Sequence, residues 1–377
     1  MAFGEEGKSL QAEVWVVFLL LVYSTIMTKL FSNKIAMVIA LLIVLGALVY
    51  GFDILKPKPA PQPPQIKKIG VVQIFSVIDS VYVGLKQGME DLGYVEGKDV
   101  VYDYQNWDQN PAKIYGMVQD LIDKNVDLIY AITDESLLSA LTLTKEAGKP
   151  IPIVFVMVED PLGIDAIESF TSSGNNTTGI VSNFAEVVPK QLEFLKRFNP
   201  DVKRLGLFTE GFISPNGPGV PVYRKIKETA PKFGITVVEY TTDAEPGPAL
   251  ENAFDEIAKN IKPGEIDAIY HLPGHFVHDQ QDREIQIGRR MNIINSMPVL
   301  EELRGTGGLF AYGSDLNAIG KQAAGIIDQI FKGAKPSDIP IGSPGINTLG
   351  INLNNAKDIG LTVPQDLIDI AGLILEE

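Results

Sequence analysis

The chain of 377 residues contains no cysteine. This absence excludes disulfide bonds, thiolate metal sites, a thiol nucleophile and a lipid-modified cysteine, although it does not assign a compartment. Basic residues are scarce as well, because 32 Lys and Arg stand against 47 Asp and Glu. Residues 1–65 hold 5 Lys and 4 acids, so the remainder carries 27 bases and 43 acids. An acidic remainder argues against a nucleic-acid partner, since phosphate binding needs a basic face.

Sequence motifs of catalysis are also missing. The chain has no Gly-rich Walker loop, no dinucleotide fingerprint, no G-x-S-x-G elbow and no H-E-x-x-H pair. We therefore expect no enzyme activity and no cofactor, and we assign no residue as a metal ligand. Acids at strand ends could act as a general acid and base, but carboxylate pairs are common in an acidic protein.

Two apolar segments open the chain, Val14–Phe31 and Ile35–Leu55. The second is uncharged for eighteen residues up to Asp53, which is long enough to cross a bilayer as a helix. Lys29 and Lys34 precede it and are expected to stay in the cytoplasm. The pattern predicts a protein of the cell membrane whose soluble part faces the extracytoplasmic side.

The N-terminal part, 1–55, leaves two alternatives open. Met27 could be the true start, which would make the segment resemble a signal sequence, and a buried soluble helix is the other alternative. No clean small-x-small cleavage site follows the apolar core, so an uncleaved anchor is preferred. Residues 56–65 form a Pro-rich linker, a semi-rigid spacer of roughly 30 Å.

From residue 66 onward, strand and helix patterns alternate. Such alternation predicts an α/β fold with parallel, doubly wound sheets, in two successive lobes at 66–181 and 182–310. The expected strands are Lys68–Ile74, Val100–Gln105, Val126–Ile132, Ile153–Val158, Arg204–Thr209, Thr236–Tyr240, Ile266–Leu272, Met297–Leu300, Leu309–Tyr312 and Leu349–Leu353. The expected helices are Val77–Leu92, Ala112–Lys124, Leu137–Ala147, Val187–Phe198, Val222–Phe233, Ala249–Ile261, Asp279–Met291, Leu316–Phe331, Ala356–Ile359 and Pro364–Leu375.

One apolar run stands out in this series. Ile153–Val158 is uninterrupted, as expected of a strand buried on both faces, and it stops at Glu159 and Asp160 before Pro161. Ligands of open parallel sheets bind outside the carboxyl ends of the strands, so this acidic turn lies where binding is expected. A solvated loop is the alternative interpretation.

A second polar stretch, Thr133-Asp134-Glu135-Ser136, lies at a strand end and a helix start. Free N–H groups and hydroxyls there can hold an anionic ligand group such as a carboxylate. Simple helix capping explains the same residues. The acids favour a zwitterion whose ammonium group lies near Asp134, Glu135 or Glu159.

All three histidines fall between His271 and His278. Clustered imidazoles could bind zinc, but Pro273 and Gly274 break any helix between His271 and His275. A lining of the ligand cleft and a plain loop are the other two interpretations.

Short segments along the whole soluble part carry a family resemblance. They occur in the expected order and are Ile69–Gln73, Asp91–Val100, Ile151–Gly163, Asn176–Val181, Ala311–Asp315, Gly333–Pro336 and Ile351–Pro364. Residues 66–377 thereby resemble the ABC-transporter substrate-binding proteins that include tryptophan- and tyrosine-binding members. The resemblance implies a periplasmic-binding-protein fold of type I. It also implies that 311–342 complete the first lobe and 343–377 the second, with chain crossings near Val181–Phe184, Leu309–Ser314 and Ser343–Thr348.

The same resemblance implies a function. The protein would capture a small polar solute, such as an amino acid, between its lobes and deliver it to an ABC permease with a cytoplasmic ATPase. A tethered extracytoplasmic enzyme or a sensor ectodomain using the same cleft is the alternative. The expected solute contacts are Gln73, Ser76, Thr133, Asp134, Glu135, Ser136, Glu159, Asp160, Glu210, His271, His275 and Asp315.

This chain departs from the family in two features. It carries an anchor and a proline stalk where a signal peptide is usual. In addition, Glu135, Glu159, Glu210 and the histidine loop stand where smaller or neutral residues are more usual. These departures bear mainly on which ligand the protein binds.

Overall fold

The computed structural model describes Val22 and residues 66–74, 76–107, 110–210, 219–244, 247–273 and 280–376. The chain separates into two compact units, Met1–Pro64 and Gln65–Glu377. The two apolar N-terminal segments, Val22 apart, and the Pro-rich linker lie outside the described residues. Within the described part of the chain, no helix is long and apolar enough to span a bilayer.

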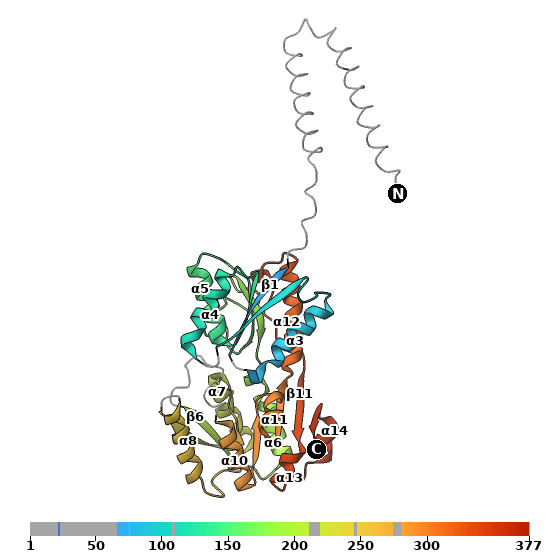
Figure 1. The fold of residues 1–377 in the computed structure, drawn as a ribbon. Coiled ribbons are helices and arrows are strands. Elements are labelled where there is room, and N and C mark those ends of the chain that lie inside the picture. Colours follow the sequence, from blue (N-terminus) through green and yellow to red (C-terminus); the bar gives the residue numbers. More distant parts are fainter. Residues whose placement is uncertain are drawn as a thin grey trace. The chain divides into compact units, whose positions relative to one another are not determined.

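The first lobe is built on a five-stranded parallel sheet with the order β2-β1-β3-β4-β5 (Figure 1). Its strands are β1 Lys67–Gln73, β2 Val100–Asn106, β3 Leu128–Ile132, β4 Ile153–Val158 and β5 Thr177–Val181. Its helices are the short η1 Ser76–Ile78, then α3 Ser80–Asp91, α4 Pro111–Asp123 and α5 Asp134–Glu146. Every residue of β3, β4 and β5 is buried, which explains the continuous apolar sequences of β3 and β4. The predicted α/β fold with parallel sheets is confirmed.

The second lobe contains a seven-stranded sheet with the order β12-β11-β10-β9-β8-β6-β7. All pairs are parallel except β10 with β11. Its strands are β6 Arg204–Glu210, β7 Thr236–Thr242, β8 Ala268–Tyr270, β9 Ile294–Met297, β10 Phe310–Ser314, β11 Asn347–Asn352 and β12 Leu373–Leu375. Its helices are α6 Phe184–Phe198, α7 Gly219–Thr229, η2 Ala230–Phe233, α8 Pro248–Asn260, α10 Gln281–Met291, α11 Leu300–Thr306, α13 Leu353–Asp358 and α14 Gln365–Ile370.

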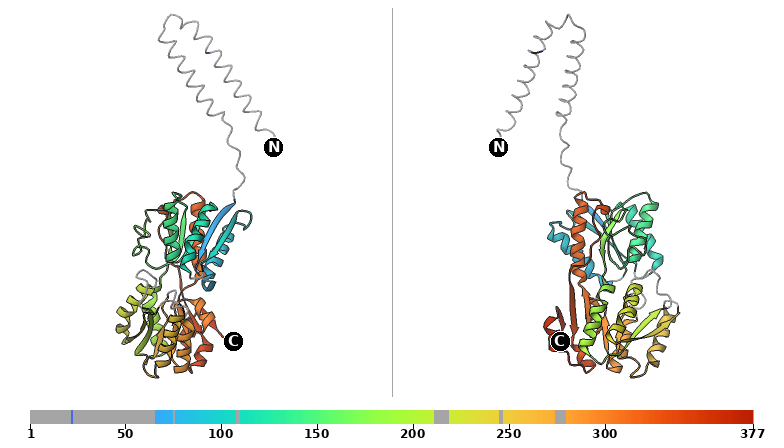
Figure 2. Two further views of the ribbon diagram at one scale, coloured as in Figure 1. Left: turned by 60° about the vertical axis from the view of Figure 1, so that its left-hand side comes forward. Right: turned by 180° about the vertical axis from the view of Figure 1, so that it is seen from behind.

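Helix α12, Leu316–Phe331, leaves the second sheet and packs along α3 of the first lobe (Figures 1 and 2). Glycines allow the two backbones to approach closely. A Cβ atom on Gly320 would lie 2.0 Å from the Val81 carbonyl oxygen, and one on Gly84 would lie 2.0 Å from the Asn317 carbonyl oxygen. The chain then passes η3, Pro336–Asp338, and runs beside β5, where Gly342 donates to the Gly179 carbonyl at 2.8 Å.

Two predicted elements of the second lobe are wrong. The strand expected over Met297–Leu300 is displaced to β9, because Pro298 cannot donate to a sheet ladder and Leu300 begins α11. The helix expected over Pro364–Leu375 ends at Ile370, and its last residues form β12, which pairs with β11. The boundary expected at residue 311 falls inside β10, so the chain leaves the second sheet only after Ser314.

The chain passes between the two sheets three times, at 182–183, at Asp315 and at 343–346. One side chain from the end of each passage meets the other two. Asn183 Nδ2 donates to Asn347 Oδ1 at 2.9 Å, and the Ser314 hydroxyl lies 3.0 Å from Asn183 Oδ1 and 2.9 Å from Asn347 Oδ1. A hydroxyl has one proton, so Ser314 donates to one of these oxygens at a time. Hydrogen bonds therefore join all three passages at one point.

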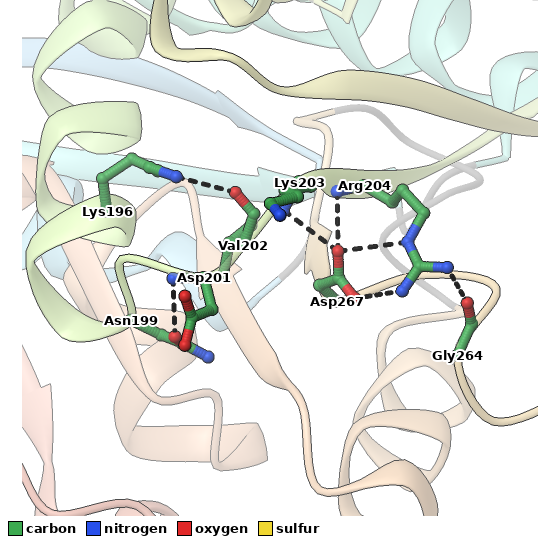
Figure 3. A network of polar contacts seen from close by, with 8 residues as sticks. All are labelled: Lys196, Asn199, Asp201, Val202, Lys203, Arg204, Gly264 and Asp267. Carbon is green, nitrogen blue, oxygen red and sulfur yellow. Dashed lines mark hydrogen bonds and ion pairs between the residues drawn. The ribbon is translucent and has the colours of Figure 1, made fainter.

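An ion pair joins two strands at the amino edge of the second sheet, the edge opposite the carboxyl ends of these strands. Figure 3 shows Asp267 receiving the Arg204 guanidinium together with the backbone N–H groups of Lys203 and Arg204. The Asp267 oxygens lie 2.5 Å from Arg204 Nη2 and 3.2 Å from Nε. The pair fastens the start of β6 to the start of β8.

Candidate functional site

The carboxyl ends of β1, β3 and β4 meet at one edge of the first sheet, since the three strands are parallel neighbours. This edge brings together the predicted residues Gln73, Thr133–Ser136, Glu159 and Asp160. Two non-glycine residues at the same edge adopt a backbone that L-residues rarely take: Thr133 has φ 80 and ψ 170, and Met157 has φ 58. Such conformations cost roughly 1–3 kcal/mol each and persist where the surroundings enforce them.

Asp134 is the unusual group of this edge. Its side chain is 4% exposed, and neither carboxylate oxygen accepts a hydrogen bond within the described part of the chain. Burial raises the pKa of Asp134 well above its ordinary value, and the charges of Glu135, Glu159 and Asp160 raise it further. The backbone N–H of Glu159 opposes this rise in pKa from nearby, without reaching hydrogen-bonding geometry.

Glu159 is engaged inside the protein. Its Oε2 accepts hydrogen bonds from the Ser182 hydroxyl and from the Phe184 backbone N–H at 3.1 Å, and its Oε1 accepts from Ala185 N–H at 2.8 Å. The Phe184 and Ala185 N–H groups belong to the first turn of α6, where backbone donors have no partner within the helix. The N-cap residue Asn183 makes no capping side-chain bond of its own. Burial raises the pKa of Glu159 by more than these three hydrogen bonds lower it, so the net direction is upward. Glu159 thus ties the end of β4 to the start of the second lobe.

Three other predicted residues of the first lobe, Ser136, Gln73 and Asp160, each form a hydrogen bond with a residue of the same lobe. Ser136 accepts from Trp107 Nε1 at 3.4 Å, and Gln73 Nε2 donates to Asp79 Oδ1 at 3.1 Å. Asp160 is exposed, and its Oδ1 accepts from Gly163 N–H at 2.9 Å.

Three further predicted residues differ in their surroundings. The Thr133 hydroxyl donates to Glu135 Oε2 at 3.2 Å, and Ser76 is exposed at the start of η1. Asp315 is exposed and caps α12 by accepting from Ala318 N–H at 3.0 Å.

His271 lies at the carboxyl end of β8 and is fully buried. Its Nδ1 is 2.8 Å from Glu284 Oε2 on α10, and Glu302 on α11 is buried nearby, where it accepts from Gln281 Nε2 at 3.2 Å. Burial lowers the pKa of His271, but the Glu284 carboxylate more than compensates and the net direction is upward. Burial likewise raises the pKa of Glu284. These contacts describe an internal pair that holds α10 against β8.

Part of the predicted histidine site cannot be placed. His275 and the side chain of Glu210 lie outside the described residues. Within the ranges that the structure describes, no group of three or more His, Asp or Glu side chains is arranged to hold a metal ion.

Sequence reasoning missed Asn183, Ser314 and Asn347 as a group. Each is a polar residue next to the end of a strand or helix, which is an ordinary pattern, and only their meeting between the sheets marks them. Trp107 was missed too, since a lone tryptophan after a strand indicates core packing as readily as a site.

The buried pair in the second lobe makes stability depend on pH. The folded pKa values of His271 and Glu284 both lie above their unfolded values, so the stability that they contribute is present at low pH and lost as pH rises. We expect the free energy of unfolding to fall as pH rises, from about pH 4.5 for Glu284 and from about pH 6.5 for His271, and the double variant His271→Gln/Glu284→Gln to flatten this slope. Urea unfolding at several pH values measures it.

The single variants and a control complete this test. Glu284→Gln alone removes one partner of a buried pair and should cost about 3–5 kcal/mol. Glu256→Gln breaks only the exposed contact with Lys259 on α8 and should change stability by less than about 1 kcal/mol. An unchanged pH slope in the double variant would show that this pair does not cause the fall of the unfolding free energy with rising pH.

Comparison with known proteins places this architecture among known relatives. Residues 68–374 match the family described as ABC transporter substrate binding protein. The chain is 24% identical over 302 residues to a protein named tyrosine-binding protein from Clostridioides difficile strain R20291, covering 78% of this chain and 81% of that protein.

Solved structures agree with this match. A conserved domain protein from Vibrio cholerae O1 biovar eltor has a TM-score of 0.71 at 25% identity, covering 82% of this chain and 100% of that chain. An ABC domain in complex with L-Trp from Streptococcus pneumonia has a TM-score of 0.68 at 21% identity, again covering 82% of this chain and 100% of that chain. The two-sheet architecture is that of a type I periplasmic binding protein.

Proposed function

The chain belongs to the family of ABC transporter substrate-binding proteins, and from this membership we propose that it captures a small polar solute and delivers it to an importer permease driven by a cytoplasmic ATPase. The solute is an amino acid, with the aromatic ones included. One curated relative is named for tyrosine, and one solved neighbour holds L-Trp, which supports this class. The matched relatives are binding proteins, which also supports a role without catalysis.

The observation that carries the proposal is the edge of the first sheet. It gathers two strained backbone positions and a buried carboxyl group that has no hydrogen-bond partner among the described residues, beside the three chain passages into the second lobe. Strained residues and unsatisfied buried groups concentrate where a protein binds something. A site beside interlobe passages suits a protein that closes on its ligand, because hinge motions concentrate in a few terminal residues of such elements.

Within this site, the roles of two acids differ. Glu159 already accepts three hydrogen bonds, so it is poorly suited to take the ammonium group of an amino acid. Asp134 accepts none from the residues that the structure describes and takes that role instead. The solute carboxylate then lies at the backbone N–H groups of the first turn of α5, where a helix N-terminus favours an anion.

Binding of an amino acid to the full chain in detergent tests this proposal. A ligand that binds only the folded state at about 100 times its Kd stabilises it by roughly 2.7 kcal/mol, so the melting temperature should rise by several degrees. We expect at least one of the twenty amino acids to produce this shift, and titration calorimetry should confirm it. If no amino acid shifts the melting temperature, an amino-acid solute is excluded.

The N-terminal segments supply the second part of the proposal. Their length and apolar character support an uncleaved membrane anchor that holds the binding domain outside the cytoplasm on the linker 56–65. Protease added to intact cells should then release a fragment that begins near residue 66. Protection of the fragment until the cells are lysed would contradict this topology, and a cytoplasmic marker protein controls for lysis.

A further inference from the structure

A hydrogen bond joins the two lobes at a point outside the three chain passages. The Ser80 hydroxyl, at the start of α3 in the first lobe, donates to Glu301 Oε1 on α11 in the second lobe at 2.9 Å (Figure 1). The two residues are 221 positions apart, so the contact depends on how the lobes lie against each other. Val299, directly before α11, is 3% exposed and packs in the apolar core of the first lobe. The start of α11 is therefore part of the surface where the lobes meet.

The Glu301 carboxyl group is partly buried at this surface. Burial raises the pKa of Glu301, and the hydrogen bond from Ser80 lowers it, so the contact favours the ionised carboxylate. The charge of Asp315 also raises this pKa and that of Arg304 lowers it, which places Glu301 close to the second passage. A hydrogen bond to an ionised group is stronger than one between neutral groups. The contact is thus suited to hold the lobes together.

Each partner of this contact is fixed in its own lobe. Helix α3 packs closely along α12, because Gly84 and Gly320 leave no Cβ atom between the two backbones. Helix α11 packs on the second sheet through Leu303, which shares an apolar cluster with Met297 and Ala311. Neither helix can follow the other lobe, so a movement that separates the lobes at this point breaks the hydrogen bond.

The first-lobe partner is connected to the edge where the solute is expected. Asp79 precedes Ser80, and its Oδ1 accepts from Gln73 Nε2 at 3.1 Å and from the Tyr104 hydroxyl at 2.7 Å. Gln73 lies at the carboxyl end of β1, and its Oε1 accepts from Ile74 N–H at 2.9 Å. The segment that Glu301 contacts therefore also sets the position of the Gln73 side chain.

We infer that Ser80 and Glu301 form a latch that stabilises the closed arrangement of the lobes and with it the position of Gln73. This inference rests on the proposed function for its solute and adds two positioning residues, neither of which needs to touch the solute. Loss of the latch populates the open arrangement. The apparent affinity for a solute then falls in proportion to the closed fraction that remains.

Distance measurements without any solute test the latch itself. Spin labels at Lys145→Cys on α5 and Lys259→Cys on α8 report on the separation of the lobes, because both positions are exposed. In the full chain in detergent, we expect Ser80→Ala to shift the population toward longer distances. Glu301→Ala should produce the same shift. Ser80→Thr keeps the hydroxyl and should restore the distribution of the parent.

A matched control separates this effect from the loss of any serine hydroxyl. Ser337, in η3 of the first lobe, donates to its neighbour Asp338 at 3.3 Å and makes this contact within one lobe. Ser337→Ala removes the same atoms as Ser80→Ala. We expect its distance distribution and its affinity for amino acids to equal those of the parent.

Titration calorimetry with L-tryptophan and L-tyrosine tests the effect on binding. We expect Ser80→Ala and Glu301→Ala each to weaken binding roughly tenfold, the effect of one hydrogen bond to a charged group. The double variant should lose no more affinity than the weaker-binding single variant, because both substitutions remove the same contact. Glu301→Gln keeps an acceptor oxygen for Ser80 and should recover part of the affinity.

The outcomes separate this inference from the proposed function. Unchanged solute-free distances in both Ser80→Ala and Glu301→Ala overturn the latch, even if amino acids bind. Losses of affinity that multiply in the double variant also overturn it, since the two residues would then act independently. If neither amino acid binds the parent chain, that failure belongs to the proposed function, and the solute-free distances alone decide whether the latch exists.

Discussion

The structure depends on the point where its chain crosses between two sheets. Three passages join the lobes, and Asn183, Ser314 and Asn347 connect them through short hydrogen bonds. Two further links bring the lobes together beside this point: Glu159 caps α6, and the Ser80 hydroxyl at the start of α3 donates to Glu301 on α11 at 2.9 Å. A movement of one lobe against the other would rearrange these groups, and the acid edge of the first sheet lies next to them.

Much of the fold could be predicted from local patterns. The strand Ile153–Val158 and the helix Leu316–Phe331 were predicted to the residue, because one is a continuous apolar run and the other begins after a capping Asp. Strand β9 was misplaced because its middle residues are polar. Asn295 is buried only because its side chain donates to the Glu284 carbonyl at 2.9 Å, a tertiary contact that no local pattern reveals. Strand β12 likewise exists only through pairing with β11.

The candidate site was less predictable than the fold. Strand ends indicated which acids share an edge, and Asp134 and Glu159 were both expected to meet the solute. Their different surroundings follow from distances: Glu159 reaches the first turn of α6, across a separation of 25 residues from Phe184, and Asp134 reaches no donor within the described part of the chain. His271 was predicted as one of several possibilities for a loop, whereas its burial against Glu284 depends on how α10 packs.

A distance measurement between the lobes tests the central claim, that this protein closes on a solute about the three passages. The absence of cysteine allows spin labels at Lys145→Cys on α5 and Lys259→Cys on α8 without removing native thiols. Both positions are exposed, one in each lobe. Pulsed electron resonance on the full chain should give a distance distribution that shifts and narrows when the tightest-binding amino acid saturates the site. Identical distributions with and without bound solute would contradict the account.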